Sequence, residues 1–418
     1  MSEQGLSVAV IGGGAAGFFG AIAAASTHPH AQVTLYEAGP QPLAKVRISG
    51  GGRCNVTHHC FDPAQLVQSY PRGGKALRGA FSRFQPKDTV QWFTQRGVKL
   101  KTEADGRMFP TTDDSATVVN CLERAAESAG VQVKVRSPIV SAKKVGNRFK
   151  LRLKSQQVVE CDRLLLTTGS SPTGHRISEA LGHQLERPVP SLFTFNIADK
   201  RLHQLSGVAV SAAHVRLKVE GASKRELKAL AQTGPLLITH WGLSGPAVLK
   251  LSAWAARSLY EQKYRAQVLV NWLPEWDQAQ VRSELQQIKG DSGKKAIATY
   301  SPFSPISKRL WQYLIARIDI DTTLTWANLS KKQLNRLVTE LTQGTFAVTG
   351  KGVFKDEFVT CGGVRLKEVD FKTMESRVCS GLYLSGEILN IDGVTGGFNF
   401  QSAWTTGWLA GQAIGYDG

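Results

Sequence analysis

Three short glycine-rich strings contain the residue types whose spacing could do chemistry. The first is Gly12-Gly13-Gly14-Ala15-Ala16-Gly17, and Glu37 follows twenty residues after it. In such a string Gly12 permits a tight turn, Gly14 lets the backbone approach a pyrophosphate, and Gly17 lets a helix pack close to a strand. Glu37 is spaced to accept hydrogen bonds from ribose hydroxyls, which favours FAD or NAD over a 2′-phosphorylated cofactor.

The second string is a run of three glycines followed by polar residues. It reads Ser49-Gly50-Gly51-Gly52-Arg53-Cys54-Asn55, with Lys45 and Arg47 just upstream. Consecutive glycines destabilise both helices and strands, so they favour a loop that lies against a flat ring or a phosphate. We expect Arg53 and Asn55 to anchor that ligand and Lys45 to add positive charge near the pyrophosphate. The alternative is an ordinary surface loop.

The third string lies near the end of the chain. A short apolar segment ends in Gly386-Glu387, Asp392 follows, and Gly396-Gly397-Phe398-Asn399-Phe400 opens a helical stretch. We expect Asp392 to bond a ribityl chain and the backbone of 397–399 to reach a flavin pyrimidine edge. A helix cap after a turn would explain the two glycines but not the whole string. Gly169, which follows the apolar run at 163–168, is a further expected cofactor contact.

The elements around these strings predict the fold class. An apolar strand at 7–11, a helix at 18–25 and a strand at 32–37 form a β-α-β unit around the first string. Short strands follow residue 190, helices fill 275–342, and strands return after 344. We therefore expect an α/β protein whose Rossmann-type domain, 1–190 and 358–418, is split by an inserted β-domain at 191–273 and about 344–357. A helical subdomain is expected at 274–343.

Taken together, the three strings resemble those of the BaiN/RdsA-like flavoproteins. The marks of that family are a GGGAAG start, a KxxISGGGRCN loop and a C-terminal GLYxxGE followed by DGxTGGxNxQ. The stretch from Thr360 to Val369 and Thr373-Met-Glu-Ser376 also match. The resemblance covers the whole chain and implies a split FAD domain with inserted β-barrel and helical parts. The chain departs from it at Leu43-Ala44, Arg47 and His58.

Charge is the unusual feature of the composition. The 418 residues include 51 Lys+Arg and 33 Asp+Glu, a formal net charge of +18. Residues 190–345 have 21 basic and 11 acidic side chains, and residues 131–159 have eight basic side chains and no acid. Such an excess favours a phosphate-rich partner such as RNA. The candidate RNA-binding residues are the basic pairs Lys200-Arg201, Lys224-Arg225, Lys294-Lys295, Lys308-Arg309 and Lys331-Lys332, although any single pair could be a solvated helix end.

The family resemblance implies a reductase. Its members include enzymes resembling the dihydrouridine synthase of large-subunit ribosomal RNA, and others linked to steroid-like small molecules. The implied reaction reduces the C5=C6 bond of a uracil. NADH or NADPH, as transient reductant, reduces FAD; the flavin then delivers a hydride to the uracil, and a protein acid supplies the proton. Cys54 is our first candidate for that acid and His240 the second, and Trp241 is a candidate for stacking on the base. For Cys54 the alternative is a loop thiol without chemistry, and for Trp241 it is a core side chain. The alternatives are a small-molecule flavin reductase and a non-catalytic FAD-containing RNA-binding factor.

Other site classes are not indicated. None of the six cysteines forms a CxxC pair, so neither a zinc site nor a redox pair is predicted. No apolar run approaches the ~20 residues that span a bilayer. We therefore expect a cytoplasmic protein with no metal, no membrane partner and no stable protein partner.

Overall fold

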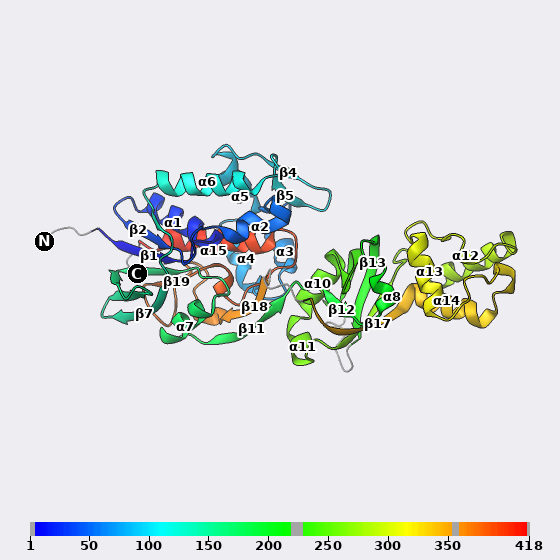
Figure 1. Ribbon diagram of the computed structural model, residues 1–418. Helices are drawn as coiled ribbons and strands as arrows, with labels where there is room; N and C mark the ends of the chain where they lie inside the picture. The colour runs from blue at the N-terminus through cyan, green and yellow to red at the C-terminus, as the bar shows by residue number, and fades with distance from the viewer. Residues whose placement is uncertain (1–4, 219–228, 353–358, 416–418) are drawn as a thin grey trace. The chain divides into compact units, whose positions relative to one another are not determined.

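The computed structural model describes residues 5–218, 229–352 and 359–415 (Figure 1). The chain divides into two compact units, residues 1–189 with 359–418 and residues 190–358. The first is the Rossmann-type unit and the second is the insertion, which confirms the predicted fold class. The candidate RNA-binding residues Lys224 and Arg225 lie outside the described residues.

A parallel sheet of five strands organises the first unit. Its order is β19-β10-β1-β2-β6, and every neighbouring pair is parallel. The two ends of the chain meet in this sheet, because β1 and β2 come from the first forty residues and β19 from the last forty. The strands span β1 (Ser7–Ile11), β2 (Gln32–Tyr36), β6 (Gln132–Lys134), β10 (Arg163–Leu166) and β19 (Leu382–Leu384).

Two glycine-containing helices pack closely beside that sheet, one from each end of the chain. They are α1 (Ala15–Thr27) and α15 (Phe398–Ala413), which lie side by side in Figure 1. A Cβ on Gly407 would stand 2.7 Å from the Ala16 carbonyl oxygen, and one on Gly411 would stand 2.5 Å from the Gly20 carbonyl oxygen. Glycine is therefore required at this contact, because any larger residue would force the helices apart.

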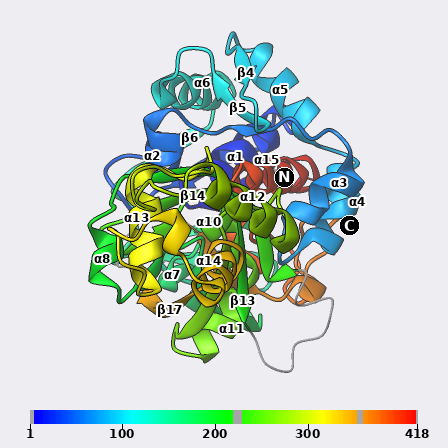
Figure 2. The same ribbon diagram turned by 90° about the vertical axis from the view of Figure 1, so that its right-hand side faces the viewer.

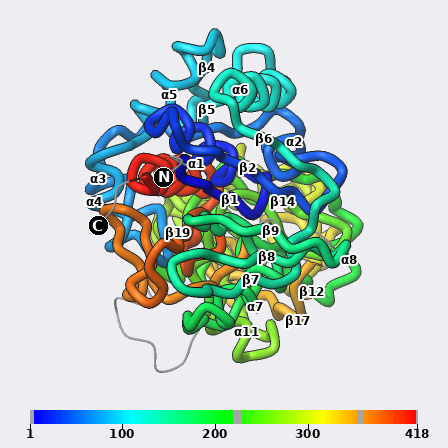
Figure 3. Tube along the Cα trace, turned by 90° about the vertical axis from the view of Figure 1, so that its left-hand side faces the viewer, coloured from blue at the N-terminus to red at the C-terminus, as the bar shows by residue number. Residues whose placement is uncertain are grey.

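The remaining elements of the first unit surround this centre. An antiparallel sheet, β7-β8-β9, lies on the face shown in Figure 3, and a two-stranded ribbon pairs β11 with β18. The bounds are α2 (Ala44–Gly52), β3 (Thr57–His58), α3 (Pro63–Leu66), α4 (Gly74–Phe81), α5 (Pro86–Thr94), β4 (Leu100–Thr102), β5 (Arg107–Pro110), α6 (Ser115–Ser128), β7 (Ile139–Val145), β8 (Arg148–Leu153), β9 (Val158–Cys161), α7 (Pro172–Ala180), β11 (Leu185–Ser191) and β18 (Val359–Val364).

The second unit is a closed barrel joined to helices. The barrel order is β12-β15-β14-β13-β16-β17, and the helical part is visible with it in Figure 2. The bounds are β12 (Phe195–Ile197), α8 (Lys200–His203), β13 (Ala209–Lys218), β14 (Ala231–Thr239), β15 (Gly242–Ser244), α10 (Pro246–Trp254), α11 (Ala256–Glu261), β16 (Ala266–Asn271), α12 (Gln278–Asp291), α13 (Lys308–Arg317), α14 (Lys331–Gln343) and β17 (Gly344–Lys351).

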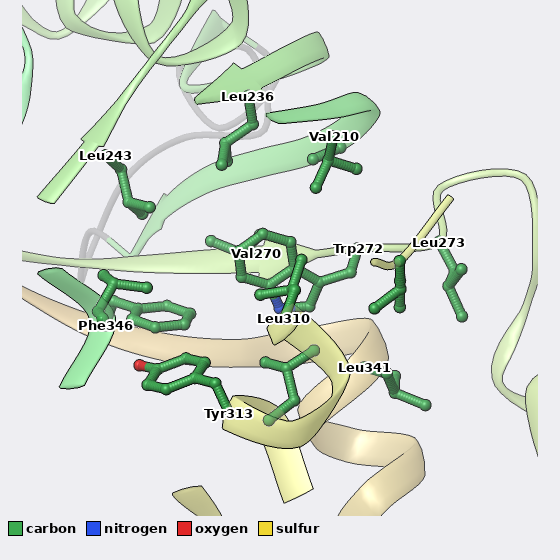
Figure 4. Close-up of a cluster of buried hydrophobic side chains, with 14 of the residues drawn as sticks. Val210, Leu236, Leu243, Val270, Trp272, Leu273, Leu310, Tyr313, Leu341 and Phe346 are labelled. Atoms are coloured by element: carbon green, nitrogen blue, oxygen red, sulfur yellow. The ribbon is translucent and has the colours of Figure 1, made fainter. Parts of the chain in front are cut away.

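One hydrophobic core joins the barrel to its helices. Figure 4 shows Trp272 and Phe346 of the barrel side packing with Leu310 of α13 and Leu341 of α14. All four are essentially inaccessible to solvent. The two parts of the insertion therefore form one body, in which burial of large apolar side chains supplies the main stabilising term.

Candidate functional site

The carboxyl edge of the parallel sheet brings together the first string and part of the third. Gly12 follows β1, Glu37 follows β2, Gly169 follows β10 and Gly386 follows β19. Because these strands are parallel, their carboxyl ends lie at the same edge, where open α/β sheets bind their ligands. Residues separated by more than 370 positions in the sequence thus share one site.

Glu37 is held by the backbone on both sides of its carboxylate. One oxygen accepts a hydrogen bond from the Gly13 N–H and the other from the Gly39 N–H, each at 2.7 Å. These bonds fix the side chain at the end of β2. Each carboxylate oxygen keeps a further acceptor direction, so the observed contacts are compatible with the predicted ribose contact.

Two glycines of the first string, Gly12 and Gly17, allow close packing of the backbone, whereas Gly14 leaves space in which a ligand could bind. A Cβ on Gly17 would stand 1.9 Å from the Gly12 carbonyl oxygen, and one on Gly12 would stand 2.5 Å from the Thr167 carbonyl oxygen. A Cβ on Gly14 would meet nothing within 4 Å. Gly14 also caps α1, whose first N–H groups receive no side-chain cap. This combination provides open space beside a helix N-terminus, which suits a pyrophosphate.

Glu387 links the C-terminal string to the N-terminal half of the site. One of its oxygens lies 2.6 Å from the Lys45 ammonium, and the other accepts the Thr360 N–H at 2.8 Å. The Lys45 side chain is about half exposed, so the pair contributes modestly to stability. Its main effect is positional, because it ties α2 to the end of β19.

The second string begins as a helix and then breaks at its glycines. Within α2, Ser49 has extended geometry, while Gly50 and Gly51 have φ values of 59° and 70°. A Cβ on Gly51 or Gly52 would meet nothing within 4 Å. The loop therefore presents bare backbone to open space, as a surface that contacts a flat ring requires.

The two predicted anchors of this loop have protein partners. The Arg53 guanidinium lies 2.6 Å from Glu103 and over the Phe109 ring at 4.0 Å. The Asn55 side chain, with its amide oriented to satisfy both partners, donates to the Thr57 carbonyl and accepts the Gly397 N–H. Asn55 thus joins the second string to the third. Direct contact of either side chain with the cofactor stays a prediction.

Cys54 is completely buried without any ligand present. Its backbone has φ of 61°, and burial raises the pKa of its thiol to about 12, opposed in part by a hydrogen bond with Ser49. The thiol is therefore protonated at neutral pH, but protein atoms cover it. The prediction that Cys54 donates a proton to substrate thus requires the loop to open.

The third string is held by buried polar contacts. Both oxygens of the fully buried Asp392 carboxylate bind the Arg72 guanidinium. Asn399 exchanges two hydrogen bonds with the Gly393 backbone, at 2.8 and 2.9 Å. A Cβ on Gly397 would stand 2.5 Å from the Thr57 carbonyl oxygen. The loop is preorganised, and the predicted ribityl contact of Asp392 stays a prediction.

Two phenylalanines of the third string stack on aromatic rings. Phe398 stacks on His58 with centroids 4.6 Å apart, and Phe400 stacks on Trp404 at 5.6 Å. His58, one of the positions where the chain departs from the family pattern, thus lies against the glycines that open α15.

Sequence reasoning missed the residues that hold these loops. Arg72 pairs with Asp392, Tyr70 donates to the Phe398 carbonyl at 2.7 Å, and buried Gln401 accepts from Thr57 at 2.6 Å. No local spacing signals these contacts, because about 320 to 345 positions separate the partners.

Two polar atoms near the end of β10 have no hydrogen-bond partner among the described residues. They are the Thr168 hydroxyl oxygen and Nε2 of His175, both buried. Burial also lowers the pKa of His175. Open space at three glycines, a free helix N-terminus and these two unpartnered atoms fit a bound dinucleotide.

The insertion contains the remaining predicted site residues. His240 and Trp241 are exposed in the turn between β14 and β15, and Trp241 is 62% exposed. Every candidate RNA-binding cation within the described residues is exposed. They are Lys200, Arg201, Lys294, Lys295, Lys308, Arg309, Lys331 and Lys332. No described helix is long and apolar enough to cross a membrane.

Comparisons with known proteins identify the family of this chain. The family described as HI0933-like protein Rossmann domain matches residues 6–413. A ribosomal RNA dihydrouridine synthase of Escherichia coli is 31% identical over 97% of both chains. A 3-dehydro-bile acid delta(4,6)-reductase of Clostridium scindens is 30% identical over 97% of this chain and 98% of its own.

A solved structure shares the fold. The 3-ketosteroid-delta4-(5alpha)-dehydrogenase of Rhodococcus jostii matches with a TM-score of 0.50 and 14% identity, covering 100% of this chain and 98% of that one. The two relatives are oxidoreductases, and the geometry above fits FAD. The chain is therefore an FAD-dependent oxidoreductase that belongs to the HI0933-like Rossmann-domain family.

Proposed function

We propose that this protein reduces the C5=C6 bond of a uridine in large-subunit (23S) ribosomal RNA to dihydrouridine, in the cytoplasm, with NADH or NADPH as transient reductant. The observation that carries the proposal is the positive charge of the insertion. Its eight described candidate cations are all exposed, and an exposed basic surface provides the counterion-releasing contacts that RNA binding needs. A pocket for an apolar small molecule has no need of such a surface.

Bound FAD would supply the hydride for this reduction. The chain supplies placement. The backbone at Gly14 and the N-terminus of α1 would hold the pyrophosphate, and Glu37 would hold the ribose. The bare backbone of 50–52 and the preorganised turn at 396–397 would orient the flavin ring and exclude water from one side of it.

The proton that completes the reduction needs a donor. Between the two candidates, Cys54 is buried and His240 is exposed beside Trp241. An exposed aromatic side chain is the type that stacks on an unstacked RNA base. Cys54, which lies on the predicted flavin loop, stays our first candidate for the donor and His240 the second, with Trp241 as the candidate for stacking on the base.

One alternative function has specific support. The bile acid reductase is as similar in sequence as the RNA-modifying relatives, so reduction of a steroid-like enone is the second candidate. A non-catalytic FAD-containing RNA-binding factor is the third. It has only the surface charge in its favour.

Dihydrouridine mapping in 23S ribosomal RNA separates these functions. A deletion strain should lose one dihydrouridine, and the purified protein with NADPH or NADH should restore it in that RNA. If Cys54 donates the proton, Cys54→Ala should keep reductant-driven flavin reduction but lower dihydrouridine formation by roughly 10²–10⁴-fold, and if His240 is the donor, His240→Ala should have that effect instead. Turnover of a 3-oxo-Δ4 steroid with unchanged RNA would favour the second candidate, and unchanged RNA with no turnover the third.

A further inference from the structure

An exposed basic sheet face occurs in the Rossmann-type unit, outside the predicted RNA-binding residues. It is the outer face of β7-β8-β9, shown in Figure 3. Along β8 the buried residues alternate with exposed ones, and every exposed position of the strand is cationic: Arg148, Lys150 and Arg152. On a strand of period two, these three side chains point to the same side at intervals of about 6.8 Å.

The register places further charge on the same face. Lys143 of β7 is directly opposite Lys150, and both are exposed. Like charges directly opposite each other destabilise an antiparallel pair. The Lys143–Lys150 pair therefore lowers the stability of the free protein. An anionic ligand bound between the two ammonium groups would attract both, and the pair would then contribute to binding.

Acidic partners neutralise only part of this face. Glu160 of β9 pairs with both Arg148 and Lys150, and Asp162 pairs with Arg148. Within the residues that the structure describes, Lys143 and Arg152 have no carboxylate within ion-pair distance. The exposed Val145 and Val158 lie opposite Arg148 and Arg152, respectively. Of these two valines, only Val158 lies opposite an unpaired cation, Arg152.

We propose that the outer face of β7-β8-β9 binds the phosphate backbone of the ribosomal RNA substrate, through Lys143 and Arg152 above all. This inference rests on the proposed function. It adds a second RNA contact surface on the unit that holds the cofactor, in addition to the basic residues of the insertion. Sequence-independent backbone contacts of this kind position a nucleic acid without reading its bases.

The test compares two double variants with equal changes in net charge. Lys143→Glu/Arg152→Glu removes the two unpaired cations of the face. Lys75→Glu/Lys87→Glu is the control, because these lysines are exposed on α4 and α5 and form no ion pair in the described structure. Binding of labelled 23S ribosomal RNA is measured by filter retention at 50 to 200 mM salt, together with dihydrouridine formation.

The face variant should bind RNA about tenfold more weakly at physiological salt, and its log–log salt slope should fall by about 1.4 to 1.8, which corresponds to two lost phosphate contacts. The control should retain the wild-type slope.

Lys143→Glu alone should be at least as stable to urea as the wild type, because it replaces a repulsive cross-strand pair with an attractive one. Weaker RNA binding by a protein of equal or higher stability excludes misfolding as the cause.

The outcomes separate the two claims. If the wild type neither binds nor modifies the RNA, the proposed function fails and this inference fails with it. If the wild type modifies the RNA and the face variant behaves as the control does, only the inference fails. Unchanged RNA binding with loss of a ribosomal protein partner would also overturn it, since the face would then serve a protein.

Discussion

Gly14 and Gly17 stand three residues apart, yet their replacement by valine should have opposite consequences. At Gly14 the φ of −88° is accessible to any residue, and an added Cβ meets nothing within 4 Å. The fold should therefore accept valine, at a cost of up to about 1 kcal/mol for a poorer N-cap. The side chain would instead fill the space through which a pyrophosphate approaches the backbone.

At Gly17 the added carbon would stand 1.9 Å from the Gly12 carbonyl oxygen and 2.8 Å from Oγ1 of Thr167. The first of these neighbours is backbone and cannot rotate away. Helix α1 would have to move off the sheet, against its close contact with α15. Overpacking of a buried site costs about 1–3 kcal/mol even where side chains can adjust, so the loss should reach at least the upper end of that range.

Urea unfolding of the apoproteins, with and without added FAD, separates the two effects. For the wild type, FAD at one hundred times its Kd should add about 2.7 kcal/mol to the free energy of unfolding. Gly14→Val should unfold close to the wild-type apoprotein and gain almost nothing from FAD, whereas Gly17→Val should be destabilised before any FAD is added. A Gly14→Val protein that is yellow and stabilised by FAD would refute the placement of the pyrophosphate.

Two further predictions concern buried groups. Arg72→Met should destabilise the protein by about 3–5 kcal/mol in urea unfolding, because it removes the guanidinium that binds both oxygens of the buried Asp392 carboxylate. Adding Asp392→Leu should recover most of that loss, and equal stability of the single variant and the wild type would contradict the prediction. Cys54 should resist iodoacetamide at pH 8 while the less deeply buried Cys60 reacts, as peptide mass spectrometry would show. Because burial raises the pKa of Cys54 and Cys161 to about 12 from about 9, the stability they contribute is complete below pH 9 and is lost as pH rises toward 12. Cys54→Ala should remove the part of this alkaline loss that is due to Cys54 and leave the part due to Cys161, and an unchanged alkaline profile would count against it.

The sequence predicts those parts of the fold that are determined by interactions between residues close together in the chain. The turn at 12–17 is one, because each glycine there has its own steric cause within a few residues. By contrast, the sequence predicts that the short strands begin after residue 190, yet β11 already contains Pro188 and Pro190. A two-stranded ribbon tolerates proline because one side of each strand needs no ladder hydrogen bond. The helix α10 was not predicted, since its apolar run lacks a clear helical period.

The site shows the same division. The backbone roles of Gly14 and Gly51 follow from residue type, and the structure leaves open space at both. The partners of charged side chains do not follow from residue type. Arg53 is predicted to anchor the cofactor, and nothing local to it indicates that it also pairs with Glu103, fifty residues away. Likewise, nothing local to Asp392 indicates Arg72. Tertiary proximity chooses among the many available counter-charges, and spacing cannot.

The contact between α1 and α15 has a consequence for biosynthesis. During synthesis, α1 leaves the ribosome almost four hundred residues before α15, which packs against it through glycines. The face of α1 that α15 covers is therefore exposed until α15 is made. The barrel and its helices are contiguous in the chain and have their own core, so they can fold in the interval. The synthesis of the Rossmann-type unit therefore begins before that of the insertion, but its folding is completed after it. The protein should be able to bind the cofactor only once α15 has been made.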